Sequence, residues 1–174
     1  RLVRSLVSRR NAIANERRRW QLRARSYLQA AGFRLPKARR TVDWLLQWAQ
    51  AQEIGIDAHL GDALQLCGRQ HKELGLELKS IDMQLHRLTK DLPEVRRLLT
   101  IPAVGEKVAI AIYSWVGDVS RFRNARLLCA YAGLVPSVHQ SGETERNGAI
   151  TKQGSTPLRS LLVQAGHVLL FRCT

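Results

Sequence analysis

Residues 60–88 read LGDALQLCGRQHKELGLELKSIDMQLHRL, and apolar positions recur through this stretch at alternating spacings of four and three. The recurring residues are Leu60, Leu64, Cys67, His71, Leu74, Leu78, Ile81, Leu85 and Leu88. This heptad pattern is that of a coiled coil, and a helix of about 30 residues would be ~45 Å long. The histidine in the seam is interpreted as a tolerated or hydrogen-bonded core residue, because no partner residue for a ligand role is visible. The stretch predicts a mainly all-α fold.

Glycines and apolar residues outside the seam refine the coiled-coil interpretation. Gly61, Gly68 and Gly75 repeat every seven residues, each directly after a d position. A glycine inside a helix costs about 1 kcal/mol relative to alanine, so three in register indicate that another helix approaches closely. Leu76 and Met83 share the f position opposite the seam. A two-stranded coil would expose both, which favours a bundle or a second packed face.

The N-terminal part of the chain predicts a second helix. Residues 2–31 contain neither glycine nor proline and are rich in arginine, leucine and alanine. One apolar stripe repeats every seven residues and consists of Leu6, Ile13, Trp20 and Tyr27. A break with glycine and proline follows, and a short helix is then expected over 41–52, with Trp44 and Trp48 on one face.

Positive charge is concentrated in the same N-terminal part. The 174-residue chain has a net charge of +14, yet residues 1–40 alone hold 13 Lys and Arg against a single acid. Such an excess indicates a polyanionic partner, so we expect Arg17, Arg18 and Arg19 in the first helix to contact DNA or RNA. The sequence shows no signal peptide and no run of about 18 apolar residues, so no membrane association is predicted.

The cysteines and the chain ends add two further expectations. Cys67, Cys129 and Cys173 lie far apart without a CxxC pair, which argues against a zinc site or a disulfide scaffold and fits a reducing cytosol. No metal ligands are assigned in this chain. The sequence opens at Arg1 instead of methionine and closes in the apolar stretch LLFRCT, so we expect a fragment of a longer protein.

A different, compact unit is predicted after Pro93 ends the long helical region. Residues 98–122, LLTIPAVGEKVAIAIYSWVGDVSRF, read as helix, tight turn and helix, with the second helix over 106–116. This is typical of a helix-hairpin-helix, in which a glycine turn and a helix N-terminus present N–H groups to a phosphate. Gly105 and Lys107 would be the contacts. Alternatively, the glycine only makes the turn of a plain helical hairpin.

Residues 136–154, PSVHQSGETERNGAITKQG, lie between a short helix expected over 123–132 and a last helix that starts near Pro157. Their Ser-Val-His-Gln-Ser alternation is strand-like, and residues 149–151 are expected to pair back on it as a small β-hairpin. Ser141 precedes a glycine, which would let a substrate approach closely, but a serine hydroxyl is a weak nucleophile until it is activated. His139, two residues earlier, is a candidate base, although such a histidine is usually incidental.

Charged residues around the serine have a functional and an ordinary interpretation. Glu143 and Glu145 are spaced to hold Mg²⁺, but they are more typical of a solvated acidic edge. Arg146, Lys152 and Arg159 supply positive charge that would stabilise an attacked phosphoryl group, or they are ordinary surface charges.

Three motifs in this order carry a resemblance: IPAVGEK, then RFRNARLLCAYAGLVPSVHQSG, then ITKQGSTPLRSLLVQA. Together they resemble the C-terminal transposase domain of one group of bacterial insertion-sequence transposases, the bridge-RNA-guided recombinases. Members of that group join an N-terminal RuvC-like DEDD domain, a coiled coil and a serine-bearing domain. The resemblance is specific over residues 93–172 and looser over the basic and coiled-coil part.

The resemblance implies that Ser141 attacks a DNA phosphodiester and forms a covalent phosphoserine, with no base role for His139. The matching positions after the serine are Arg146, Lys152, Gly154 and Arg159. The resemblance implies that the three basic residues contact nucleic acid, either to position the DNA or to stabilise charge. In the family, carboxylates of the DEDD domain bind Mg²⁺ and complete the site, and no such domain is visible upstream in this chain. The chain alone is therefore expected to bind nucleic acid but to cut and rejoin DNA poorly or not at all, which leaves its status as an enzyme open.

The sequence thus predicts three parts: a basic helix and linker over 1–40, a short helix plus coiled coil over 41–92, and a helix-hairpin-helix serine transposase domain over 93–174. The expected partners are DNA, a guide (bridge) RNA and further copies of the chain, which would assemble through the coiled coil. The expected location is the bacterial cytoplasm, at the nucleoid. Two alternatives stay open: a nucleic-acid-binding module without chemistry, and a coiled-coil scaffold whose charge serves RNA or membrane lipid.

Overall fold

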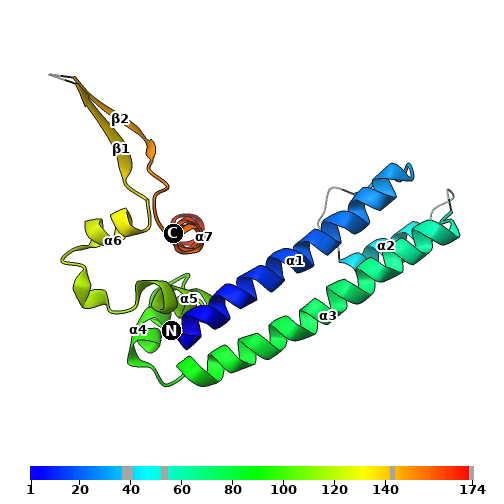
Figure 1. The fold of residues 1–174 in the computed structure, drawn as a ribbon, viewed down its shortest axis with the longest axis horizontal. Coiled ribbons are helices and arrows are strands. Elements are labelled where there is room, and N and C mark those ends of the chain that lie inside the picture. The colour runs from blue at the N-terminus through cyan, green and yellow to red at the C-terminus, as the bar shows by residue number, and fades with distance from the viewer. Residues whose placement is uncertain (37–40, 52–54, 142–143, 173–174) are drawn as a thin grey trace. The chain divides into compact units, whose positions relative to one another are not determined.

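The computed structural model describes residues 1–36, 41–51, 55–141 and 144–172, without the side chains of 138–147 and 172. Within these ranges the chain forms seven α-helices, one 3₁₀ turn and one two-stranded hairpin (Figure 1). The elements are α1 Leu2–Ala30, α2 Val42–Gln50, α3 Ala58–Thr89, α4 Pro93–Leu99, α5 Glu106–Val116, η1 Val119–Arg121, α6 Ala125–Tyr131, β1 Pro136–Ser141, β2 Thr144–Ile150 and α7 Thr156–Arg172. The mainly all-α fold with a small β-hairpin is therefore confirmed.

The chain divides into two compact units. One comprises Ser8–Gln84, and the other comprises Arg1–Val7 together with Leu85–Thr174. Among the described residues, none of the helices combines the length and the hydrophobicity needed to cross a bilayer.

In the first unit, α1 and α3 run side by side in opposite directions (Figure 1). Two ion pairs join the helices: Arg9 Nη2 lies 2.6 Å from Glu77 Oε1, and Arg10 Nε lies 2.5 Å from Asp82 Oδ1. The second pair is the less exposed of the two, so water screens it less.

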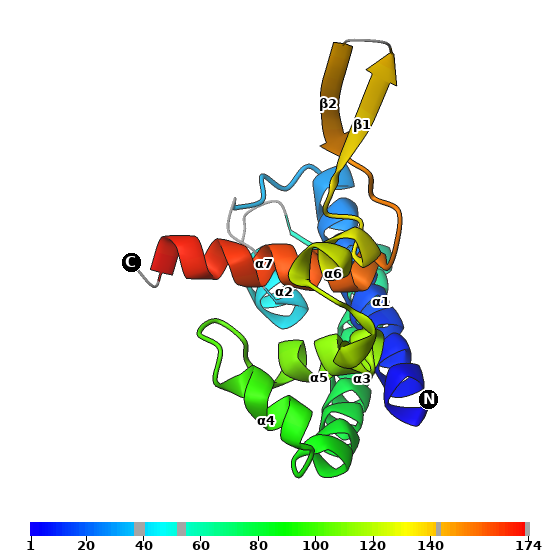
Figure 2. The ribbon, with the colours of Figure 1, turned by 90° about the vertical axis from the view of Figure 1, so that its left-hand side faces the viewer.

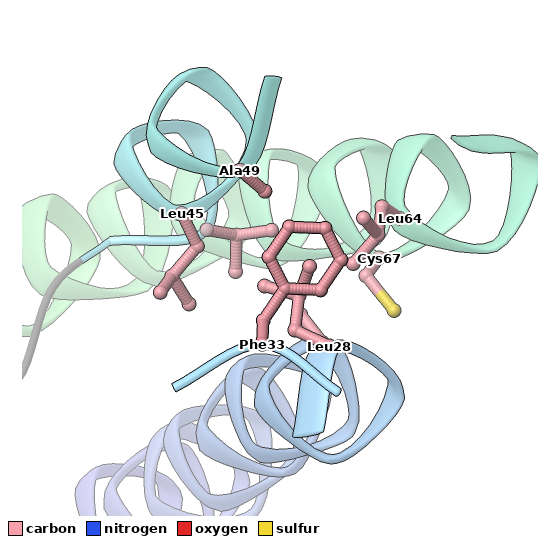
Figure 3. Close-up of a cluster of buried hydrophobic side chains, with 8 residues drawn as sticks. Leu28, Phe33, Leu45, Ala49, Leu64 and Cys67 are labelled. Atoms are coloured by element: carbon pink, nitrogen blue, oxygen red, sulfur yellow. The ribbon is translucent and has the colours of Figure 1, made fainter. Parts of the chain in front are cut away.

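The core of this unit is a cluster to which α1, α2, α3 and the α1–α2 connection all contribute. Figure 3 shows Phe33 between the side chains of α2 and those of α1 and α3. The buried members are Ala24, Leu28, Phe33, Val42, Leu45, Ala49, Leu64 and Cys67. The Thr41 hydroxyl accepts a hydrogen bond from the Trp44 amide and caps α2, which places the apolar face of this short helix in the cluster.

The heptad seam of α3 is buried within the single chain. Six of the nine predicted seam residues are buried: Leu64, Cys67, His71, Leu78, Ile81 and Leu85. The glycines beside the seam lie where other groups approach closely. A Cβ at Gly68 would lie 3.5 Å from Leu46 of α2, and one at Gly75 would lie 3.4 Å from the Arg17 guanidinium. The close approach predicted from these glycines is confirmed at both positions.

The apolar stripe predicted for α1 is wrong at its C-terminal end. Tyr27 is 43% exposed, whereas Ala24 and Leu28 are completely buried. Val7 near the start of the helix is also buried, so the buried positions lie one residue after the predicted stripe at both ends of α1. In α3, Leu88, the last predicted seam residue, is 44% exposed, while Thr89 is buried.

The second unit packs α4, α5, α6 and α7 around a small apolar core. Its buried members are Ile112, Val116, Ala132 and Leu158. Ser155 begins α7, because its hydroxyl accepts a hydrogen bond from the Leu158 amide at 3.4 Å. Pro157 lies in the first turn, where a missing N–H costs nothing. Leu158 thereby ties the start of α7 to the core.

Candidate functional site

The predicted hairpin forms, and Ser141 is the last residue of its first strand. β1 and β2 are antiparallel, with Ser141 opposite Thr144 and His139 opposite Arg146. The side chains of these four residues lie outside the described part of the structure, and so does Glu143 altogether. The backbone thus places Ser141 at the end of the ladder that lies away from α6 and α7 (Figure 2).

A bulge lies near the base of the hairpin. The register changes between Pro136 and Val138, where Gly148 and Ala149 both lie opposite Ser137. Ser137 Oγ donates a hydrogen bond to the carbonyl of Ala149 at 3.1 Å. A Cβ at position 148 would collide with that hydroxyl oxygen, so any other residue there would force the Ser137 side chain to rotate and give up this hydrogen bond.

Below the bulge, two backbone segments approach so closely that glycine is needed on both sides. Gly133 ends α6 with φ of 69°, and the Leu134 amide donates to the Cys129 carbonyl at 2.9 Å, as in a Schellman motif. A Cβ at Gly133 would collide with the backbone of Gln153, and one at Gly154 would collide with the carbonyl oxygen of Tyr131. We call residues 132–134 and 152–156 the hairpin root.

Arg159 of α7 fastens the hairpin root. Its Nη1 donates to the carbonyls of Ala132 at 3.2 Å and Lys152 at 3.0 Å, and its Nη2 donates to Thr156 Oγ1 at 3.1 Å. The predicted nucleic-acid residue Arg159 is thus bonded to protein oxygens from the ends of α6 and β2 and the start of α7. Lys152 is exposed and has φ of 55°, and its amide donates to the Gly133 carbonyl at 3.1 Å.

The predicted phosphate-binding turn lies between α4 and α5. Residues 101–104 form a tight turn in which the Val104 amide donates to the Ile101 carbonyl at 3.1 Å and Ala103 has φ of 67°. Gly105 is the N-cap of α5 and makes no side-chain cap hydrogen bond. Gly105 and Lys107 are both exposed. The Glu106 carboxylate, next to them, contacts His86 Nδ1.

The C-terminal part of the chain is similar to known proteins. Residues 95–174, which contain the turn, the hairpin and its root, match the family described as Transposase IS116/IS110/IS902. We call residues 95–174 the transposase domain because of this similarity. The chain is 29% identical over 166 residues to the transposase for insertion sequence element IS1111A of Coxiella burnetii, which covers 95% of this chain and 44% of that protein.

Two further relatives support the same assignment. A probable family 20 transposase of Pseudomonas aeruginosa is 31% identical over 137 residues, covering 74% of this chain and 38% of that protein. The pilin gene-inverting protein of Moraxella bovis is 33% identical over 99 residues, covering 54% of this chain and 31% of that protein. The chain therefore spans less than half the length of these relatives.

Arg121 of the transposase domain was not singled out from the sequence. Arg121 is exposed, and its guanidinium lies 4.6 Å from the centroid of the Phe122 ring and 4.7 Å from that of Tyr131. Tyr131 is itself held, because its hydroxyl donates to the Trp115 carbonyl at 3.2 Å. Contact with two rings restricts the orientation of the guanidinium, while the N–H groups along its edge can still bind an anion. The only local signal was an arginine next to a phenylalanine.

The three arginines predicted from the basic helix lie in the first unit and differ from one another. Arg17 is partly buried and donates from Nε to the His71 carbonyl at 3.2 Å. Arg19 pairs with Glu16 at 3.1 Å. Arg18 is exposed, and across the described ranges the structure assigns its side chain no hydrogen bond or ion pair. Of the three, Arg18 is the most available to a polyanion.

Metal-binding side chains do not gather in the described ranges. Within them, no three His, Cys, Asp or Glu residues are placed to hold an ion. Cys67 and Cys129 are free thiols, and burial raises the pKa of Cys67. Cys173 and Glu143 lie outside the described residues.

Proposed function

We propose that this chain is part of an insertion-sequence transposase in which Ser141 cleaves and rejoins DNA strands. The observation that carries the proposal is the hairpin of the transposase domain, which ends one strand at Ser141 and is fixed at its base by the hairpin root. A serine presented at the end of a two-stranded arm can reach a phosphodiester that the helices cannot approach. The names of the relatives, transposases and a gene-inverting protein, support a reaction that moves DNA segments.

The proposed chemistry is a reversible phosphoryl transfer. Ser141 Oγ attacks the phosphorus and loses its proton, a phosphoserine bond forms, and the deoxyribose oxygen leaves and takes up a proton. A deoxyribose hydroxyl of another strand then attacks the phosphoserine, which frees the serine and joins the strands. Negative charge on the phosphoryl oxygens needs cationic partners, for which Arg146 and Lys152 on the hairpin are the proposed candidates.

DNA would bind the transposase domain through backbone phosphates. The proposed contacts are the N–H groups at Gly105, the ammonium of Lys107 and the guanidinium of Arg121, all exposed. A helix N-terminus and a restricted guanidinium both favour a phosphate without reading its base. The helix-hairpin-helix role of the α4–α5 turn is part of this proposal.

The remaining partners concern the other parts of the protein. Arg18 and the basic face of α1 would contact the guide RNA. Because the seam of α3 is already buried within the chain, assembly with further copies would use other surfaces, such as the exposed f-position residues Leu76 and Met83. The proposed location is the bacterial cytoplasm at the nucleoid, where the DNA substrate is found.

The family resemblance implies a magnesium ion bound by another domain of the protein. Mg²⁺ needs several oxygen ligands around one point, and the described part of this chain offers no such group. These residues do not fit the ion, and no step above is routed through it. The expected ligands are carboxylates of a DEDD domain.

The nucleophile is tested in a fusion of this chain, at Arg1, to the DEDD domain of a related transposase, supplied with guide RNA and cognate DNA. We expect a covalent protein–DNA adduct that survives denaturation, and its complete loss in Ser141→Ala. His139→Gln is the matched control in the same strand and should keep the adduct. Persistence of the adduct in Ser141→Ala would sink the assignment.

Two other classes of function predict different results in DNA-binding and adduct experiments. A binding module without chemistry would bind DNA and would form no adduct in the fusion. A coiled-coil scaffold would show no steep loss of DNA affinity with salt, whereas phosphate contacts make the logarithm of affinity fall linearly with that of salt. Lys107→Gln should lower that salt slope by about one if the ammonium contacts a phosphate.

A further inference from the structure

We propose that Arg159 is a positioning residue, which sets the hairpin of Ser141 through the hairpin root and does not contact DNA phosphate. The inference rests on the proposed nucleophile role of Ser141. It replaces the expectation, drawn from charge and from the family resemblance, that this arginine belongs to the nucleic-acid-binding surface.

The hydrogen bonds of the guanidinium are the first argument. A guanidinium has five N–H donors, and both hydrogens of Nη1 are used by the carbonyls of Ala132 and Lys152. One hydrogen of Nη2 goes to Thr156 Oγ1. The positive charge therefore faces two carbonyl dipoles, one of which belongs to the last turn of α6. Because both Nη1 hydrogens are used, the edge formed by the two Nη groups is already occupied by protein.

The position of those acceptors is the second argument. Ala132 precedes the residues that lead into β1, and Lys152 follows β2, so one guanidinium bridges both ends of the hairpin. Arg159 is also adjacent to Leu158, which is completely buried in the core of the transposase domain. The arginine thereby links the base of the arm to the part of the domain that is least free to move.

The fit of the two backbones is the third argument. The glycines at 133 and 154 let the two segments touch without side chains between them, and the amides of Thr151 and Lys152 donate to the carbonyls of Val135 at 2.9 Å and Gly133 at 3.1 Å. Without the guanidinium, these two hydrogen bonds would be the first to open. A small rotation at the root becomes a large displacement at Ser141, five ladder residues beyond Pro136.

Arg159→Lys distinguishes a positioning role from a phosphate contact, because lysine keeps the positive charge and lacks the planar, multiple N–H donors of the guanidinium. A single ammonium on a flexible stem cannot hold two carbonyls and a hydroxyl in the geometry of a planar guanidinium. A phosphate contact would be largely restored by Arg159→Lys, whereas a positioning role would not. Thr156→Val is a milder second variant, which removes one bond and leaves the charge of Arg159 unchanged.

The first measurement is amide hydrogen exchange in the 174-residue chain, at a temperature where circular dichroism shows each variant folded. We expect exchange at the amides of Thr151 and Lys152 to rise about tenfold or more in Arg159→Lys and Arg159→Gln, because charged hydrogen bonds are lost. Thr156→Val should show a smaller rise. Arg126→Gln, an exposed arginine of α6 with the same loss of charge, is the matched control and should show native exchange.

The second measurement separates positioning from binding. In the DEDD fusion, Arg159→Lys should slow adduct formation at saturating DNA by about tenfold or more, in step with the exchange. The dissociation constant for DNA and its salt slope should stay at the parent values.

The opposite pattern overturns the inference: native exchange and adduct formation in Arg159→Lys, with a salt slope about one lower in Arg159→Gln. The two proposals fail separately. If Ser141→Ala keeps the adduct, the nucleophile is wrong while the exchange result still reports on the root.

Discussion

Arg17 donates a hydrogen bond from Nε to the backbone carbonyl of His71, 3.2 Å away on the neighbouring helix. The guanidinium also lies against Gly75, where a Cβ would come within 3.4 Å of it. An arginine expected to face a polyanion is thus part of the helix packing. The glycine repeat of α3 explains why, since a side chain at position 75 would compete with Arg17 for the same space.

The first prediction compares Arg17 with its neighbour. Arg17→Gln should lower the free energy of unfolding by about 1–2 kcal/mol, because a charged hydrogen bond to a carbonyl and the contact with Gly75 are lost. Arg18→Gln, the matched control on the exposed face, should change it by less than about 0.5 kcal/mol. Urea denaturation followed by circular dichroism measures both. Equal losses would show that Arg17 has no special place in the packing.

The second prediction concerns pH. Burial lowers the pKa of His71 below its usual value of 6.5, the Arg17 guanidinium lowers it further, and the Asp43 carboxylate opposes the shift. The folded protein therefore binds fewer protons than the unfolded chain near pH 6, so stability rises with pH and is lost as pH falls from about 6.5 toward the folded pKa. His71→Gln should show a smaller loss of unfolding free energy between pH 7 and pH 5 than the parent. An unchanged loss would mean that other groups cause the pH dependence.

The third prediction concerns the hairpin root. Gly133→Ala should lower the unfolding free energy by about 2 kcal/mol or more, because φ of 69° is strained for alanine and the new methyl group meets the Gln153 backbone. Gly154→Ala should behave in the same way. Gly166→Ala in α7 is the control, since its Cβ would meet nothing within 4 Å, and it should stabilise by up to about 1 kcal/mol. Thermal unfolding of the three variants is the measurement. If Gly166→Ala destabilised the protein as much as the two root variants, or if all three stabilised it, the packing described for the root would be wrong.

The fourth prediction places the same substitution in two environments. Ala103 has φ of 67° at the position of the α4–α5 turn that favours glycine, so Ala103→Gly should be neutral or stabilise by up to about 1 kcal/mol. Ala109→Gly, buried inside α5, should destabilise by about 1 kcal/mol or more. Chemical denaturation of both variants decides the point. Destabilisation by Ala103→Gly would show that the turn does not strain this residue.

Periodicity and local chemistry were enough to predict much of the fold. The alternating spacing from Leu60 to Leu88 lies within α3, the alanine-rich run after Gly105 is α5, and the serine stretch forms the hairpin. Each of these rests on neighbours in sequence, where spacing and turn residues act directly. The stripe predicted for α1 failed at Tyr27, because apolar character and spacing alone do not show which of two neighbouring apolar residues, Tyr27 or Leu28, faces the core.

The roles of individual arginines could not be predicted in this way. Charge and position marked Arg17 and Arg159 as nucleic-acid contacts, yet both donate to backbone carbonyls, 54 residues away for Arg17 and 27 residues away for Arg159. Such partners exist only after the chain has folded. Arg121 was missed for a related reason, since its second ring, Tyr131, comes from α6.

Above the bulge the two strands pair without any irregularity, so the length of the hairpin follows directly from the number of paired residues. From Val138 and Asn147 to Ser141 and Thr144 the register is constant, so each residue added to both strands would lengthen the arm by about 3.4 Å. Adding two residues to each strand would carry the serine about 7 Å farther out and preserve the face to which its side chain points, whereas adding one would reverse that face. Changing the strands by two residues at a time would therefore alter the reach of the proposed nucleophile and leave unchanged the face on which it lies.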